Sequence, residues 1–231
     1  MHRFFVQDGQ EASFVSLKNP EQVHQIRDVL KLQPGEQITL VLANGDEAVC
    51  EITSFGKNDL SLGVVERRKN AAEPVRQVTL FCAVLKRDHF ELVVEKATEA
   101  GVSVIVPVIT SRTVKLGVQE ERLKKIMREA AEQSGRGVVP KLMPIMNFAS
   151  ALEDIKKFDD AIFFDMAKQM MAEKDVVGKK SIALFVGPEG GWTPEERSVA
   201  EAAGCAIRSL GPLTLRSETA AIVATYNAIH F

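Results

Sequence analysis

The chain has 231 residues, 45% of them hydrophobic and 26% charged, which is enough apolar material for one large globular domain or two small ones. Its 29 Lys and Arg residues against 31 Asp and Glu give a formal net charge of −2, so no overall positive field draws the chain onto nucleic acid. The sequence lacks an apolar run of about 18 residues and has no signal-peptide pattern at its start, which predicts a cytoplasmic protein without membrane contact.

The N-terminal third of the chain is predicted to form a small β-domain. Apolar or alternating runs, separated by turn signals, cover residues 2–7, 36–42, 46–55 and 59–66. A short helix fits between Pro20 and Leu32, and its predicted apolar face holds Val23, Ile26, Val29 and Leu30. Short strands at close spacing suggest a small barrel. The polar, proline-containing segment 66–77 that follows is typical of a linker.

Beyond about Val75, strands and helices alternate. Buried-type strands are predicted at residues 78–85, 103–109, 161–165, 181–187 and 205–211. Helices are predicted through Phe90 and Ala97, over residues 119–134, and from Thr193 and Ser217 onward. This alternation predicts an α/β domain whose parallel sheet is covered by helices on both faces.

Positive charge gathers in one part of the sequence. Residues 112–141 hold eight Lys or Arg residues and four Asp or Glu residues, a local net charge of +4. Such a segment is either a phosphate-binding surface or the solvated face of a helix, and charge alone does not decide between them.

The segment 181–196 is the first candidate binding loop. A buried strand ending at Val186 runs into Gly-Pro-Glu-Gly-Gly at 187–191, and Thr193, Pro194 and Glu196 have the positions of an N-cap, a first helical residue and a capping box. Glycines at the carboxyl end of a parallel strand allow a ligand to approach the backbone closely. The alternative is a tight strand-to-helix turn with no ligand.

A second loop follows the last predicted strand. Leu210-Gly211-Pro212 leads to Arg216, just before a helix that Ser217 is predicted to cap. The two Gly-Pro turns could therefore form two walls of one pocket. The sequence contains no GxxxxGK[ST], GxGxxG or GxSxG motif, and its four histidines and three cysteines lack metal-ligand spacing, so we expect no metal site.

The two loops belong to a larger set of motifs. This set comprises RFF at 3–5, HxxxxVLKL at 24–32, VEKATEAGV at 94–102, EAAEQSGR at 129–136, LFVGPEGGWTPEE at 184–196 and LGPLTLRSETAA at 210–221. Over nearly its whole length the sequence resembles the bacterial uridine-N3 methyltransferases of 16S ribosomal RNA, the RsmE family of the SPOUT superfamily. Lys31 and Trp192 stand where the family commonly has arginine and phenylalanine.

The resemblance implies a fold, a cofactor and partners. It implies a PUA-like β-barrel that binds RNA at residues 1–72, and a SPOUT methyltransferase domain with a deep trefoil knot at residues 73–231. It further implies S-adenosyl-L-methionine as cofactor, a homodimer, and 16S ribosomal RNA, free or in the assembled small subunit, as substrate. The candidate cofactor-binding residues are Val186, Gly187, Gly190, Gly191, Leu210, Gly211, Leu215 and Arg216.

The implied reaction must remove a proton from N3 of a uridine that is unpaired or flipped out. Neither loop contains a histidine, so Arg216 is the first catalytic candidate, because a guanidinium stabilises the developing uridine anion. Glu189 or Glu218 could accept the proton or orient Arg216. The structural alternatives are an anchoring role for Arg216 and a helix-dipole role for Glu218.

The candidate RNA contacts are Arg3, Arg27, Lys31, Arg112 and Arg136, for which solvated charge is the alternative. Two rival functions remain open at this stage. One is another specificity within the same superfamily, such as ribose 2′-O or tRNA methylation. The other is a non-catalytic RNA-binding or ribosome-assembly protein that keeps the knot.

Overall fold

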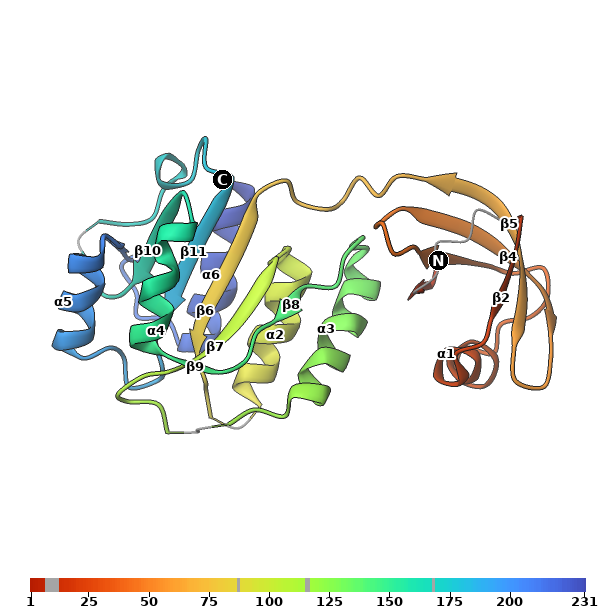
Figure 1. Ribbon diagram of the computed structural model, residues 1–231, viewed down its shortest axis with the longest axis horizontal. Helices are drawn as coiled ribbons and strands as arrows, with labels where there is room; N and C mark the ends of the chain where they lie inside the picture. The colour runs from red at the N-terminus through yellow and green to blue at the C-terminus, as the bar shows by residue number, and fades with distance from the viewer. Residues whose placement is uncertain (7–12, 87, 115–116, 168) are drawn as a thin grey trace. The chain divides into compact units, whose positions relative to one another are not determined.

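The computed structural model describes the chain except residues 7–12, 87, 115–116 and 168. The chain forms two compact units, Met1–Glu73 with Ala131–Val138 and Pro74–Ala130 with Val139–Phe231 (Figure 1). The short segment 131–138 therefore belongs with the N-terminal strands, although it is far from them in sequence. Within the described residues, no helix has the length and apolar character needed to cross a membrane.

The N-terminal unit is built on a five-stranded sheet with the order β1-β3-β4-β5-β2. Its strands are β1 (Arg3–Phe5), β2 (Phe14–Leu17), β3 (Gln37–Val41), β4 (Glu47–Phe55) and β5 (Leu60–Arg68). β1 pairs with β3 in parallel, and the other described pairs of this sheet are antiparallel. Four of these strands match the sequence prediction, whereas β2 was missed because its exposed residues alternate with partly buried ones along a short edge strand.

The helix predicted at residues 20–32 begins as α1 (Pro20–His24) and continues as a π-helical segment, Gln25–Val29. Val23 and Ile26 are buried as expected, but Val29 is 62% exposed, so its predicted place on the apolar face is wrong. A π-helical turn holds more residues than an α-helical one, so it shifts the face on which each later residue lies.

The second unit contains a sheet with the order β12-β10-β11-β6-β7-β8, with β9 also paired to β7. Its strands are β6 (Gln77–Ala83), β7 (Val104–Ile109), β8 (Lys141–Leu142), β9 (Met146–Asn147), β10 (Asp160–Phe164), β11 (Ser181–Val186) and β12 (Ala206–Arg208). Every strand pair described in this sheet is parallel, as the sequence predicts.

Helices cover both faces of this sheet (Figure 1). The longer helices are α2 (His89–Ala100), α3 (Glu120–Ser134), α4 (Phe148–Glu153), α5 (Pro194–Ala203) and α6 (Ser217–His230), and the short 3-10 segments are Asp154–Lys157 and Glu173–Asp175. Leu80 and Leu184 of the sheet pack in a core with α2, α3 and α6, whereas Phe81 and Phe185 pack in the opposite core with α4 and α5. The alternation follows from the two-residue period of a strand.

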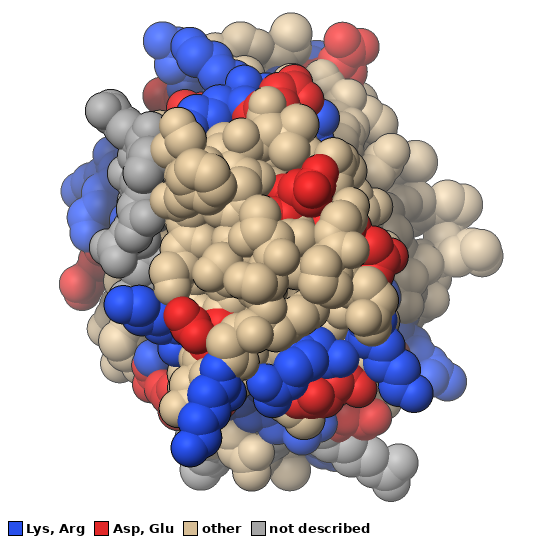
Figure 2. Space-filling model, turned by 90° about the vertical axis from the view of Figure 1, so that its right-hand side faces the viewer, with Lys and Arg blue, Asp and Glu red and all other residues tan. Residues whose placement is uncertain are grey.

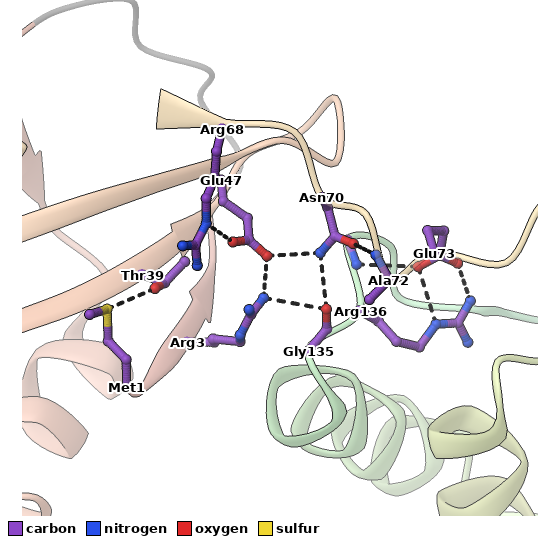
Figure 3. Close-up of polar contacts among 11 residues, drawn as sticks. Met1, Arg3, Thr39, Glu47, Arg68, Asn70, Ala72, Glu73, Gly135 and Arg136 are labelled. Carbon is purple, nitrogen blue, oxygen red and sulfur yellow. Dashed lines mark hydrogen bonds and ion pairs between the residues drawn. The ribbon is translucent and has the colours of Figure 1, made fainter. Parts of the chain in front are cut away.

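A buried carboxylate organises the N-terminal unit (Figure 3). Glu47, whose side chain is 4% exposed, accepts hydrogen bonds from Arg3, from Nε of Arg68 at 2.8 Å and from Nδ2 of Asn70 at 2.8 Å. Burial opposes ionisation, but the hydrogen bonds from Arg68 and Arg3 outweigh it and hold the pKa of Glu47 below its usual range. Glu47 thus remains charged, and its hydrogen bonds join β4 to Arg3 of β1 and to Asn70 in the segment after β5.

The segment predicted as a linker is ordered by side-chain contacts. Nδ2 of Asn70 also donates to the carbonyl oxygen of Gly135 at 2.9 Å, and Glu73 pairs with Arg136, whose side chain is 4% exposed. The carboxylate of Glu73 further accepts from the backbone nitrogen of Gly137 at 3.2 Å. These contacts explain why residues 131–138 belong to this unit.

Candidate cofactor and substrate pocket

A cavity of about 500 Å³ opens at the carboxyl ends of β10 and β11. Because β10 lies between β12 and β11, the segments that follow these three parallel strands meet at one edge of the sheet. The cavity is lined by residues 164–166, 186–189, 191–192, 209–211, 213–218 and 220, together with His89. The predicted meeting of the two Gly-Pro loops in one pocket is therefore confirmed for Gly187, Pro188 and Gly211.

The first loop packs against the indole ring of Trp192. A Cβ atom on Gly187 would lie 2.9 Å from the indole ring of Trp192, so a larger residue cannot stand there without moving the ring. The indole nitrogen donates to the carbonyl oxygen of Phe164 at 3.0 Å, which fixes the loop after β11 against the end of β10. Thr193 and Glu196 form the predicted capping box at the start of α5.

Neighbouring segments hold the outer side of this loop. Nη1 of Arg112 donates to the carbonyl oxygen of Gly190 at 2.7 Å, and Oε1 of Glu189 accepts from the backbone nitrogen of Lys86 at 2.8 Å. Glu189 lines the cavity, but Gly190 is not among the described residues that do. Gly190 thus supports the loop, while Val186, Gly187 and Gly191 face the space where a ligand fits.

The second loop supplies an apolar wall with one polar atom in it. Leu210 and Leu215 line the cavity, and Gly211 has a φ of +138° with open space where its Cβ would be. Ser209 also lines the cavity and is 5% exposed, and its Oγ has no hydrogen-bond partner among the described residues. An unpaired buried hydroxyl in a pocket fits a ligand that brings its own polar group.

The start of α6 forms the rim of the pocket. Arg216, not Ser217, is the N-cap residue, and no side chain caps this end, so the predicted Ser217 cap is wrong. The reason is that Arg216 still has extended backbone angles, which place Ser217 inside the first turn. Within the described part of the chain, the exposed guanidinium of Arg216 makes no hydrogen bond or ion pair, so it can meet an anion in the pocket.

Glu218 and His89 lie at the same rim. Glu218 is 7% exposed, and its Oε2 is 3.9 Å from Nδ1 of His89, the first residue of α2. The sequence predicted Glu218 as a site residue but not His89, because histidines outside the two loops were weighed only as metal ligands and not as bases. His89 reaches the pocket because α2 follows β6 and β6 is the neighbour of β11, an order that no local sequence pattern records.

The predicted RNA contacts are scattered and differ in exposure. Arg3 and Arg136 are engaged with Glu47 and Glu73, and an RNA contact by either would require its ion pair to open. Contact of these two residues with RNA stays a prediction. Arg27 and Lys31 are exposed. Arg27 lies beside Asp28, and hydrogen bonds from Arg27 and His24 lower the pKa of Asp28 to about 2.

Surface charges elsewhere are also balanced. On the face of the N-terminal unit drawn in Figure 2, Lys and Arg side chains lie among Asp and Glu around an uncharged area. On α3, Arg122 pairs with Glu91 of α2, and Lys124 pairs with Glu120 and Glu121 of its own helix. Part of the positive charge of residues 112–141 is thus ion-paired on this helix face, and a phosphate-binding role for the rest stays a prediction.

A parallel sheet covered on both faces, with a glycine-lined pocket at the carboxyl ends of its strands, defines an α/β enzyme that binds a nucleotide-like cofactor. The family model for an RNA methyltransferase domain matches residues 71–228, and the model for an RNA methyltransferase PUA domain matches residues 17–65. The chain belongs to the ribosomal RNA small subunit methyltransferase E family.

The relatives cover almost the whole chain. The ribosomal RNA small subunit methyltransferase E of Bacillus subtilis is 32% identical, with 97% of this chain and 94% of the relative aligned. That of Rickettsia conorii is also 32% identical, over 93% of this chain and 88% of the relative. The crystal structure of the Neisseria gonorrhoeae protein bound to S-adenosyl methionine has a TM-score of 0.86 and 28% identity, covering 97% and 95% of the two chains.

Proposed function

We propose that this protein transfers the methyl group of S-adenosylmethionine to N3 of one uridine in small-subunit ribosomal RNA. The observation that carries the proposal is the pocket formed by the two glycine loops, in a chain whose relative from Neisseria gonorrhoeae was solved with this cofactor. The relatives' name supplies the substrate class.

The pocket suits S-adenosylmethionine in size and chemistry. A volume of about 500 Å³ lies within the usual range for cofactor sites. Leu210 and Leu215 offer apolar contacts to the adenine ring, and the unpaired Oγ of Ser209 offers a hydrogen bond. Gly191 and Gly211 line the pocket with open space where a Cβ would be, so they keep side chains out of the space that the cofactor requires.

The bound cofactor supplies a methyl group activated by a sulfonium. The chain's own residues must then hold the uridine, remove its N3 proton and stabilise the negative charge that follows. Arg216 lies on the rim with its guanidinium free among the described residues, where it can face the developing anion. Glu189 is tied to Lys86, so its role in this proposal is to fix the loop.

The remaining parts of the proposal concern the domains and the assembly. Residues 1–72 serve as the RNA-binding domain, through Arg27 and Lys31, and residues 73–231 as the methyltransferase domain with a C-terminal trefoil knot. A homodimer in the cytoplasm is the working form, in which the RNA-binding domain of one subunit serves the pocket of the other. Arg112 anchors the loop at Gly190 and is proposed to contact a phosphate of the RNA as well.

Mass spectrometry of ribosomal RNA tests the proposal. Small subunits from cells that lack this protein should miss one methyl group on one uridine, and the purified protein with S-adenosylmethionine should restore it at N3. A methyl group restored on a ribose or on tRNA would replace the proposal with another specificity. RNA that misses no methyl group would replace it with a role in ribosome assembly.

A further inference from the structure

His89 is a titratable side chain at the pocket that the proposed function has not used. It lines the cavity from the first position of α2, and its side chain is 35% exposed. Its Nδ1 is buried without a hydrogen-bond partner among the described residues, and the nearest carboxylate oxygen, Oε2 of Glu218, is 3.9 Å away. One ring nitrogen therefore faces a carboxylate, and the exposed part of the ring faces the pocket.

The reaction needs a proton acceptor, and the other candidates at the rim are poorly suited to the task. Arg216 carries a guanidinium, a hydrogen-bond donor without an acceptor atom. Glu189 is already an acceptor for the backbone of Lys86. Glu218 is only 7% exposed, and its Oε2 lies 3.9 Å from Nδ1 of His89, so it is less open to a substrate than the partly exposed imidazole. Imidazole is the side chain most often used for proton transfer near neutral pH.

We propose that His89 is the general base that accepts the N3 proton of the target uridine, and that Glu218 is its positioning residue. The inference rests on the proposed function and deepens it. The N3–H proton moves to Nε2 of His89, and the N3 electron pair forms the new bond to the methyl carbon. The carbon–sulfur bond breaks with its pair remaining on sulfur, which leaves neutral S-adenosylhomocysteine and an imidazolium beside Glu218.

The pair has the geometry of an oriented imidazole. A hydrogen on Nδ1 directed at Glu218 leaves the lone pair on Nε2 free for the substrate, and the carboxylate stabilises the imidazolium that forms. The distance of 3.9 Å is long for a hydrogen bond, and such catalytic contacts shorten when substrate binds. The other charged groups that line the pocket are Arg216, Glu189 and Asp165, and Asp88 precedes α2. Asp165 is already paired with Nη1 of Arg197 at 3.0 Å.

The test compares His89→Ala and His89→Gln with the native protein in single-turnover methyl transfer to unmethylated small subunits. Both variants should transfer the methyl group at least about 100-fold more slowly, on the scale of losing a general base. Their affinity for S-adenosylmethionine, measured by calorimetry, should change by less than about threefold. The His230→Ala variant is the matched control, because His230 is an exposed histidine at the far end of α6.

Two further measurements separate a base from a structural contact. Free imidazole should restore part of the rate of His89→Ala. Subunits whose RNA carries 5-fluorouridine, whose N3–H is more acidic, should reduce the deficit of both His89 variants, because an acidic substrate depends less on a base. Glu218→Gln should lose about tenfold in rate and regain part of it with 5-fluorouridine, as expected for a residue acting through His89.

The outcomes distinguish the two proposals. If the native protein methylates no uridine at N3, the proposed function is wrong. If it does, but folded His89 variants transfer at nearly the native rate, the base is another group. A rate loss that is equal on uridine and 5-fluorouridine and is not restored by imidazole would also overturn the inference, and would assign His89 to the packing of α2 against α6.

Discussion

Nη1 of Arg112 donates a hydrogen bond of 2.7 Å to the backbone carbonyl oxygen of Gly190. The contact joins the segment after β7 to the loop after β11, and a Cβ atom on Gly190 would already lie 3.4 Å from Cβ of Arg112. The loop that carries Gly187 and Gly191 into the pocket is therefore held from outside by a cation. Arg112 thus anchors the loop at the pocket, and its predicted contact with RNA remains untested by this geometry.

Arg112→Ala should weaken cofactor binding about fivefold, because the carbonyl of Gly190 loses a charged donor and the loop becomes less ordered. Arg112→Lys should recover part of the loss. Calorimetry with S-adenosylmethionine measures both, with Arg122→Ala as control, since Arg122 pairs with Glu91 outside the pocket. Unchanged cofactor affinity together with a lower salt dependence of RNA binding would return Arg112 to the role of phosphate contact.

The sequence predicted the two loops of the pocket because strand, glycine and capping signals are local. It did not predict His89 or Phe164, since these come to the pocket through the strand order, with β6 and β10 on either side of β11. Strand order in a parallel sheet depends on long-range packing, which no local pattern records. The same limit applies to Arg136, whose burial depends on Glu73 in a distant part of the sequence.

Gly211→Val should weaken S-adenosylmethionine binding at least about tenfold, roughly 1.4 kcal/mol. The φ of Gly211 is +138° and its Cβ would enter open space beside the pocket lining, so the new side chain would occupy room that the cofactor needs. Gly178→Val is the matched control, because Gly178 also has a positive φ with open space but does not line the pocket. The control should lose stability but not affinity; equal affinities in the two folded variants would contradict the prediction.

Glu47→Gln should destabilise the N-terminal unit by about 2 kcal/mol at pH 7, because Arg3 and Arg68 lose the carboxylate that they share. The loss stays moderate because water can still solvate the guanidinium of Arg68. The pKa of Glu47 is lower in the folded state, so its contribution is complete above the unfolded value of about 4.3 and is lost as the pH falls through the folded value.

Chemical denaturation of the native protein and of the variant at pH 7 and pH 3 measures this effect. The difference in unfolding free energy should be large at pH 7 and smaller at pH 3. Glu51→Gln is the control, because Glu51 is an exposed residue of the same strand, β4. A difference that does not shrink at low pH would show that Glu47 acts by packing and not by its charge.

Arg27→Ala combined with Lys31→Ala should lower the slope of log affinity against log salt by about two phosphate contacts. Both residues are exposed on the N-terminal unit, and Lys31 has a positive φ of 55° just after the π-helical segment. Filter binding to small-subunit RNA over a salt series gives the slope. Lys156→Ala with Lys180→Ala, which removes two exposed charges from the other unit, should leave it unchanged if binding is local.

Arg216→Lys tests whether the rim cation acts on the reaction or only on the fold. A cation near a positively charged methyl donor opposes cofactor binding, so its presence is favourable only if an anion also forms there, as deprotonated uridine would. Lysine keeps the charge but loses the planar donor pair. The transfer rate should therefore fall about 100-fold, whereas cofactor affinity should change by less than about threefold, roughly 0.6 kcal/mol.

Single-turnover transfer to unmethylated small subunits, together with a cofactor titration, separates the rate from the affinity. Arg122→Lys, on the surface of α3, is the control for the same chemical change away from the pocket. In the native protein the guanidinium of Arg216 has no partner among the described residues, so its replacement should not disturb a contact that holds α6. If the lysine variant transfers at nearly the native rate, a positive charge alone is sufficient at this position. Directed hydrogen bonds to the anion must then come from other groups. The uncapped backbone nitrogens at the start of α6 are the nearest candidates.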